Sequence, residues 1–284
     1  MSGSYYIPSE TKWPFLSTVA LIILFVGLSN YLNDESDLTL MFTGLALLMV
    51  VVYGWFSYVI KESEAGIYNS QVDMSFRWGM AWFIFSEVMF FSAFFGALYY
   101  ARELSLPWLG GDGAKVSTNI VLWPQFENVW PSNGPENYGG DFIYMKAAGI
   151  PAINTLILLT SGLTVTWAHH GLKEAKRNQL IWGLIATVLL GFLFVGLQAY
   201  EYMHAYSDLN LKLTSGIYGS TFYMLTGFHG FHVTLGAIML TVILIRCING
   251  HFTSQNHFGF EAVAWYWHFV DVVWLGLFVF VYWL

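Results

Sequence analysis

Acidic and histidine side chains stand inside long apolar stretches of this sequence, where they could carry proton chemistry. Glu87 lies within the run Phe85–Phe91, which is otherwise apolar apart from Ser86. A carboxylate in the middle of a bilayer costs roughly 3 kcal/mol, so it must face protein or water, or hold a proton. We expect Glu87 to be protonated at neutral pH unless His229 or His232 approaches it as a cation. It could serve as a proton-relay or lipid-site acid, or as a neutral, hydrogen-bonded packing residue.

Two further pairs of polar residues could ligate a transition metal. His229 and His232 are three residues apart, as are His268 and Asp271, so each pair shares one helix face. His and Asp are metal ligands, but membrane di-iron sites use repeated Glu-x-x-His elements, and no such repeat is present. The neighbours His169–His170 would point about 100° apart on a helix. We therefore expect no metal site, and we expect Asp271 to accept a hydrogen bond from a histidine.

These side chains must be positioned by membrane-spanning helices. A helix needs about 20 apolar residues to cross the hydrocarbon layer of a bilayer. Seven stretches qualify, over about 14–32, 40–60, 78–100, 150–167, 180–200, 220–245 and 262–283. The expected fold class is all-α, a single polytopic membrane domain over residues 1–284 with seven transmembrane helices. The connections are short except for an outer loop over 101–147, and a loop of that length usually has a function or forms an interface.

Composition supports a membrane protein. Of the 284 residues, 56% are hydrophobic and only 10% are charged, whereas soluble domains are about 25% charged. A nucleic-acid partner is excluded because the sequence has no basic stripe. The single cysteine, Cys247, excludes an internal disulfide and a cysteine-based zinc cage. The first apolar run is longer than the 7–15 residues of a signal-peptide core, so we expect a retained first helix.

The positive charges predict the orientation of the chain, because cytoplasmic segments carry an excess of Lys and Arg. With the N-terminus inside, the inner segments hold Lys12, Lys61, Arg77, Lys173, Lys176, Arg177 and Arg246. The outer segments then hold Arg102, Lys115, Lys146 and Lys212. This bias indicates an N-terminus inside and a C-terminus outside.

Several blocks of the sequence resemble the subunit III family of haem–copper cytochrome c oxidases. The most specific block is His257–Ala262 followed by Trp265–Trp274. The others are Tyr218–Tyr223, Thr226–Gly230 with His232–Val233, Thr166–His170, and Arg77–Met80 through Ser86–Phe91. The blocks occur in the family's order and cover most of the chain, apart from residues 1–53 and the long loop.

The resemblance implies a non-catalytic core subunit of an aa3-type cytochrome c oxidase, with no catalytic residue, metal or haem of its own. Haem and copper would lie in partner subunits, among them catalytic subunit I and subunit II. Cytochrome c would be a partner of the complex and not directly of this chain. The family's seven helices form two groups, the first two and the last five, around a cleft that holds structural phospholipid. The subunit supports proton uptake during oxygen reduction and proton pumping, and it protects the catalytic centre from inactivation.

The resemblance also assigns phospholipid contacts to Lys61, Glu62 and Arg246. For Lys61 and Arg246 the alternative is ordinary snorkelling of a long cationic side chain toward the interface. Mitochondrial relatives often have a histidine pair where this chain has Ile67–Tyr68, and bacterial relatives can have N-terminal histidines that Met1–Lys12 lacks. The long outer loop favours a bacterial inner membrane over a mitochondrial one.

Three alternatives remain open at this stage. A quinol oxidase subunit III typically lacks the first two helices, so the stretches 14–32 and 40–60 argue against it. A proton-coupled transporter could use Glu87 and Asp271 as its carboxylates and would work in isolation. A metal-dependent membrane enzyme would carry a metal on the isolated chain.

Overall fold

The computed structural model describes residues 6, 11–33, 37–137 and 139–284. Its described helices and short helical turns are α1 (Trp13–Leu32), α2 (Thr39–Glu64), α3 (Ser70–Tyr100), a π turn (Ala101–Ser105), α4 (Leu106–Leu109), a 3-10 turn (Gly113–Lys115), α5 (Val116–Leu122), α6 (Ile150–Lys173), α7 (Arg177–Ser207), α8 (Gly216–Ile248), α9 (Phe258–Leu277) and a terminal π turn (Phe278–Trp283). Seven helices among the described residues are long and apolar enough to cross a membrane, and these residues form no strand. The predicted all-α class with seven spans is confirmed. The N-terminal segment before Thr11 lies, apart from Tyr6, outside the described residues.

The chain divides into two compact units, Met1–Trp78 and Gly79–Leu284. The expected grouping of two and five helices around a lipid cleft stays a prediction.

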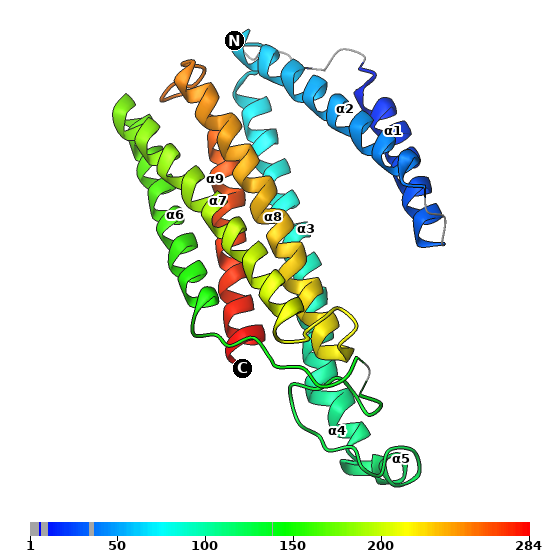
Figure 1. Ribbon diagram of the computed structural model, residues 1–284. Helices are drawn as coiled ribbons and strands as arrows, with labels where there is room; N and C mark the ends of the chain where they lie inside the picture. The colour runs from blue at the N-terminus through cyan, green and yellow to red at the C-terminus, as the bar shows by residue number, and fades with distance from the viewer. Residues whose placement is uncertain (1–5, 7–10, 34–36, 138) are drawn as a thin grey trace. The chain divides into compact units, whose positions relative to one another are not determined.

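In the first unit, α1 and α2 pack against each other as an antiparallel pair (Figure 1). Two glycines explain how closely they approach. A Cβ at Gly27 would lie 2.3 Å from the backbone nitrogen of Met41, and one at Gly44 would lie 2.3 Å from that of Leu24. Small residues of this kind let membrane helices meet backbone to backbone.

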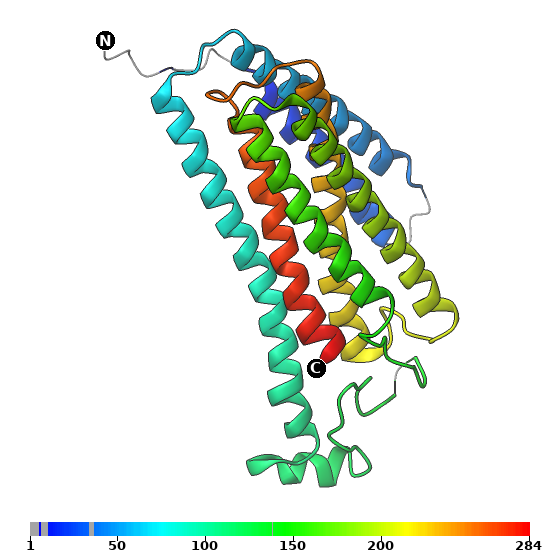
Figure 2. The same ribbon diagram turned by 90° about the vertical axis from the view of Figure 1, so that its left-hand side faces the viewer.

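The second unit is a bundle in which α6 packs on α7 and α9, and α8 packs on α7 and α9 (Figures 1 and 2). Its centre is Trp267 of α9, whose side chain is fully buried. A Cβ at Gly191 of α7 or Gly236 of α8 would come within 2.9 Å or 2.8 Å of the Trp267 ring. The indole nitrogen of Trp267 donates a 2.9 Å hydrogen bond to Ser161 of α6. One side chain therefore joins four helices.

The helices expected from the sequence were too short, because they left out the polar residues at their ends. The helix expected over 78–100 begins at Ser70, and the one expected over 180–200 runs over Arg177–Ser207. The expectation counted apolar residues only. Outside the hydrocarbon layer a polar residue continues a helix without a burial cost, so the helices outlast their apolar runs.

The segment 101–147 is only partly the loop that the sequence predicts. Its first half contains the two short turns, α4 and α5, and the rest is irregular. Trp130 and Phe142 pack on the ring of Tyr218, at the start of α8, with centroid separations of 5.5 Å each. The backbone N–H of Tyr218 donates to the carbonyl of Ser132 over 3.2 Å. Aromatic contacts therefore anchor this segment to the end of the bundle.

Candidate functional site

Glu87 and His232 form a partly buried pair between α3 and α8. His232 Nε2 lies 3.0 Å from Glu87 Oε2, and the side chains are 9% and 21% exposed. The rings of Phe90 and Phe91 stand beside the imidazole, with centroids 6.1 Å and 5.1 Å away. Of the two histidines that could approach Glu87, the structure selects His232.

The second nitrogen of His232 limits the protonation states of this pair. Nδ1 lies 2.6 Å from the carbonyl oxygen of Phe228. A carbonyl can only accept, so Nδ1 must carry a proton. The Nε2–Oε2 contact then needs one further proton, held either by the Glu87 carboxyl or by Nε2. In both cases the pair has no net charge, which is what a low-dielectric interior requires.

We expect the proton of this pair to reside on Glu87, because the neutral arrangement avoids burying two separated charges. Infrared difference spectra of the wild type against Glu87→Gln should then show a protonated carboxyl band assigned to Glu87 at pH 7. His232→Gln should shift that band, because its hydrogen-bond partner changes, and Ser86→Ala on the neighbouring exposed face should leave it in place. A carboxylate band at pH 7 without a protonated one would show that His232 holds the proton.

His229 has a different environment from His232. Its ring packs on Phe194 and Trp274, with centroid separations of 5.7 Å and 5.1 Å, and the side chain is fully buried. Its Nε2 lies 3.2 Å from the backbone carbonyl of Val270 on α9, to which it donates. His229 therefore joins α8 to α9 as a packing residue.

Asp271 does not receive the histidine hydrogen bond that we expected. His268 Nδ1 lies 3.9 Å from Asp271 Oδ2, which is too long for a hydrogen bond. His268 Nε2 instead lies 3.2 Å from the hydroxyl of Thr166 on α6. Asp271 Oδ2 occupies the space beside Gly162, where a Cβ would be 2.5 Å from it. The prediction is wrong because α9 turns this carboxylate toward the α6 backbone. The four residues considered as metal ligands also do not converge in the described part of the chain.

Glu201 is a buried acid that the sequence analysis missed. Its Oε1 accepts hydrogen bonds of 2.6 Å from the Tyr282 hydroxyl and 3.2 Å from Gln198 Nε2. Asn154 of α6 donates to Gln198 Oε1 over 3.3 Å. The residue escaped attention because the fifth helix was expected to end at Tyr200, one position earlier. A signal was available, because Tyr202 and Met203 follow directly after Glu201.

A second missed cluster combines His169, His257 and Glu261. His169 lies near the end of α6, and the other two lie at the start of α9. Glu261 Oε1 is 3.5 Å from His257 Nε2 and 3.7 Å from His169 Nε2. Three potential ligands thus meet at one end of the bundle. The sequence analysis considered His169 only together with His170, with which it makes a poor ligand pair.

At the first unit, Glu62 is already engaged by tyrosines. Its carboxylate accepts hydrogen bonds of 2.7 Å from Tyr6 and 2.8 Å from Tyr68. The hydrogen bond to Glu62 raises the pKa of Tyr6 to about 12. Burial, followed by the same hydrogen bond, raises the pKa of Tyr68 above its usual value. Both hydroxyls therefore keep their protons across the physiological range and act as donors to Glu62.

The two candidate lipid-binding cations differ in their surroundings. Lys61 is exposed at the end of α2. Arg246 lies over the ring of Phe252, with its guanidinium carbon 4.2 Å from the ring centroid. The guanidinium is therefore stacked on an aromatic face, a contact that arginine favours.

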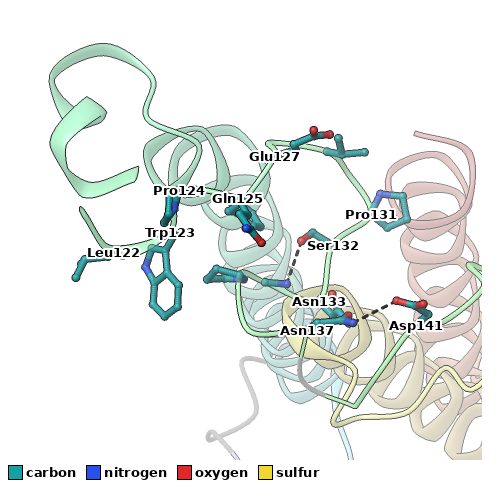
Figure 3. A pocket seen from close by; sticks show the side chains of 14 residues that line it. Leu122, Trp123, Pro124, Gln125, Glu127, Pro131, Ser132, Asn133, Asn137 and Asp141 are labelled. Atoms are coloured by element: carbon teal, nitrogen blue, oxygen red, sulfur yellow. Dashed lines mark hydrogen bonds between the residues drawn. The ribbon is translucent and has the colours of Figure 1, made fainter. Parts of the chain in front are cut away.

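A pocket of about 680 Å³ lies wholly within residues 122–141 (Figure 3). Its walls are held by turns: the Gly134 N–H donates to Ser132 Oγ over 3.0 Å, and Asn137 Nδ2 donates to Asp141 Oδ1 over 3.2 Å. None of the residues that the sequence singled out for chemistry lines it. It is a feature of the loop and not of the buried polar groups.

Comparisons with known proteins all point to one family. A family model described as Cytochrome c oxidase subunit III matches residues 3–284. The protein named Cytochrome c oxidase subunit 3 of Carassius auratus is 42% identical over 281 residues, covering 99% of this chain and 97% of that protein. Its counterparts in Gadus morhua and Pongo abelii are 41% identical over 281 and 283 residues, with the same coverage. The similarity extends across both compact units.

Proposed function

This chain belongs to the cytochrome c oxidase subunit III family, and we propose that it stabilises the catalytic subunit I of the complex and supports proton uptake during oxygen reduction. It is an integral membrane protein and a subunit of a terminal oxidase. The family match over residues 3–284 carries the proposal. Haem and copper then belong to subunits I and II, and cytochrome c docks on the complex rather than on this chain.

The arrangement of the buried polar groups favours an accessory subunit of the oxidase over an independent transporter. A carrier needs carboxylates that a substrate or ion can reach and leave. Glu87 is paired with His232, and Glu201 is held by Tyr282 and Gln198. These hydrogen bonds run from α3 to α8 and from α7 to the turn after α9, so they are suited to joining helices within a rigid bundle.

Purification at native expression tests this role. The chain should copurify with a haem-bearing subunit, seen as a haem absorption spectrum at constant ratio to this polypeptide. The separated polypeptide should contain neither iron nor copper in stoichiometric amount. Proton-coupled transport by the purified chain alone, without a haem partner, would contradict the proposal.

We further propose that Lys61 and Arg246 bind phospholipid phosphates. Each cation near an anionic headgroup layer is stabilised by about 1 kcal/mol, which is about fivefold in affinity for each site taken alone. Replacing both with Gln should lower the phospholipid retained after mild detergent extraction, as measured by mass spectrometry. The matched control replaces Lys115 and Lys212, which lie outside the helices that contain the candidate residues. Equal lipid content in the two double variants would contradict the proposal that Lys61 and Arg246 bind phospholipid phosphates.

Glu62 has a different place in this proposal. Each of its oxygens accepts one hydrogen bond from a tyrosine, and a carboxylate oxygen has a second lone pair for a headgroup donor, so we propose Glu62 as a headgroup contact beside Lys61. The charge bias supports an N-terminus inside and a C-terminus outside. The length of segment 101–147 supports a bacterial inner membrane.

A further inference from the structure

The cluster of His169, His257 and Glu261 has the composition of a metal site. Two imidazoles and one carboxylate are the ligand set of one class of zinc site, in which three protein ligands bind the ion and water takes the fourth position. One ligand atom from each residue lies within 4.8 Å of the other two. The residues come from α6 and α9, which lie side by side (Figure 2).

The orientation of His257 is fixed by a contact behind it. Its Nδ1 lies 3.0 Å from the backbone carbonyl of Thr253, to which it donates. The lone pair of the neutral ring is then on Nε2, directed at Glu261. Metal-binding histidines nearly always have such a backbone or carboxylate acceptor on the second nitrogen. The His257 side chain is 8% exposed, so this lone pair points into the protein.

The described residues leave both histidines without a hydrogen bond at this point. His169 Nε2 and His257 Nε2 are each buried, and neither has a hydrogen-bond partner within the described part of the chain. Their distances to Glu261 Oε1, 3.7 Å and 3.5 Å, exceed the 2.7–2.9 Å of charge-assisted hydrogen bonds. Two ligands bound to tetrahedral zinc at about 2.05 Å lie about 3.3 Å apart. The observed separations therefore suit a shared ion better than direct hydrogen bonds.

We propose that His169, His257 and Glu261 bind one divalent transition-metal ion, with Zn²⁺ as the best match to two nitrogens and one oxygen. The ion would tie the end of α6 to the start of α9 and would supply no redox chemistry. The proposal departs from the expectation of no metal on this chain, which considered the pairs 229/232 and 268/271 and not this combination.

The test measures binding of radioactive Zn²⁺ to the intact purified oxidase after dialysis against a chelator. The wild-type complex should bind one tightly held Zn²⁺ ion that the Glu261→Gln complex does not hold. Glu261→Gln keeps the shape of the side chain while removing the anionic ligand, and we expect at least about tenfold weaker binding. Binding should also weaken as the pH falls, because protons compete for the imidazoles. His170→Gln, which changes the exposed neighbour of His169, should bind like the wild type.

Two substitutions of His257 distinguish loss of a metal ligand from loss of packing. His257→Cys retains a zinc ligand, whereas His257→Ser is similar in size and removes it. We expect the cysteine variant to bind Zn²⁺ and the serine variant to lose it, at equal haem content per complex. Equal zinc stoichiometry in the wild type, Glu261→Gln and His257→Ser would overturn the proposal, as would an equal loss in His170→Gln.

Discussion

Replacing Trp267 with alanine is expected to cost the bundle about 3–5 kcal/mol, the range measured for removing a buried aromatic side chain. The indole is fully buried and fills the space that Gly191 and Gly236 leave open. In a membrane the loss is one of packing, because lipid is as apolar as the core and association depends on van der Waals contact. The hydroxyl of Ser161 would lose its donor as well. The expected result is a much lower yield of assembled oxidase and a lower thermal midpoint.

Trp182→Ala is the matched control for this experiment. Trp182 also lies in the bundle, on α7, but its side chain is 66% exposed. Its removal leaves no cavity between helices and should change stability by no more than about 0.5 kcal/mol. Equal effects of the two substitutions would show that the packing of four helices on Trp267 does not control assembly.

Replacing Gly44 with alanine is expected to disrupt the pairing of α1 and α2. The new Cβ would lie 2.3 Å from the backbone nitrogen of Leu24, whereas ordinary contact begins at 3.4 Å. The neighbour is main chain, so it cannot rotate away and the helices must separate. Overpacking of this kind typically costs about 1–3 kcal/mol, occasionally more. The measurement is the thermal midpoint of the purified complex together with the protease sensitivity of the α1–α2 connection.

Gly96→Ala makes the same chemical change without the clash. Gly96 lies within α3, and a Cβ there would meet no atom within 4 Å. Alanine favours helix by about 1 kcal/mol over glycine, so this variant should be as stable as the wild type or slightly more stable. A thermal midpoint that falls equally in both variants would contradict a steric origin.

The sequence predicted the spans well because the length of an apolar run is a local property. The helix ends were less predictable, and a buried acid was missed for this reason, because Glu201 lies one residue beyond the expected end at Tyr200. The pairing of Glu87 could not be resolved from spacing, because the choice between His229 and His232 depends on the rotation of α8 about its axis. That rotation is set by packing against α7 and α9.

Contacts between distant segments were the hardest part of the site to predict. His169 and Glu261 are far apart in the sequence, and only the pairing of α6 with α9 brings them together. A partial signal was available, because His257 and Glu261 are four residues apart and share one helix face. The Tyr68 hydrogen bond to Glu62 was also not predicted, because it depends on the path of the chain between α2 and α3.

The length of α3 has a practical consequence for labelling the protein. Its 31 residues extend about 47 Å, and at an average tilt of about 20° they cover about 44 Å, close to the full thickness of a bilayer with its headgroups. The helical turns after Tyr100 continue this candidate span to Leu109, and Ser117 lies beyond it. Cys247 is the only cysteine and is buried, so a cysteine in place of the exposed Ser117 would be the one thiol open to a membrane-impermeant reagent. A fluorophore or spin label attached there would report from one face of the membrane alone.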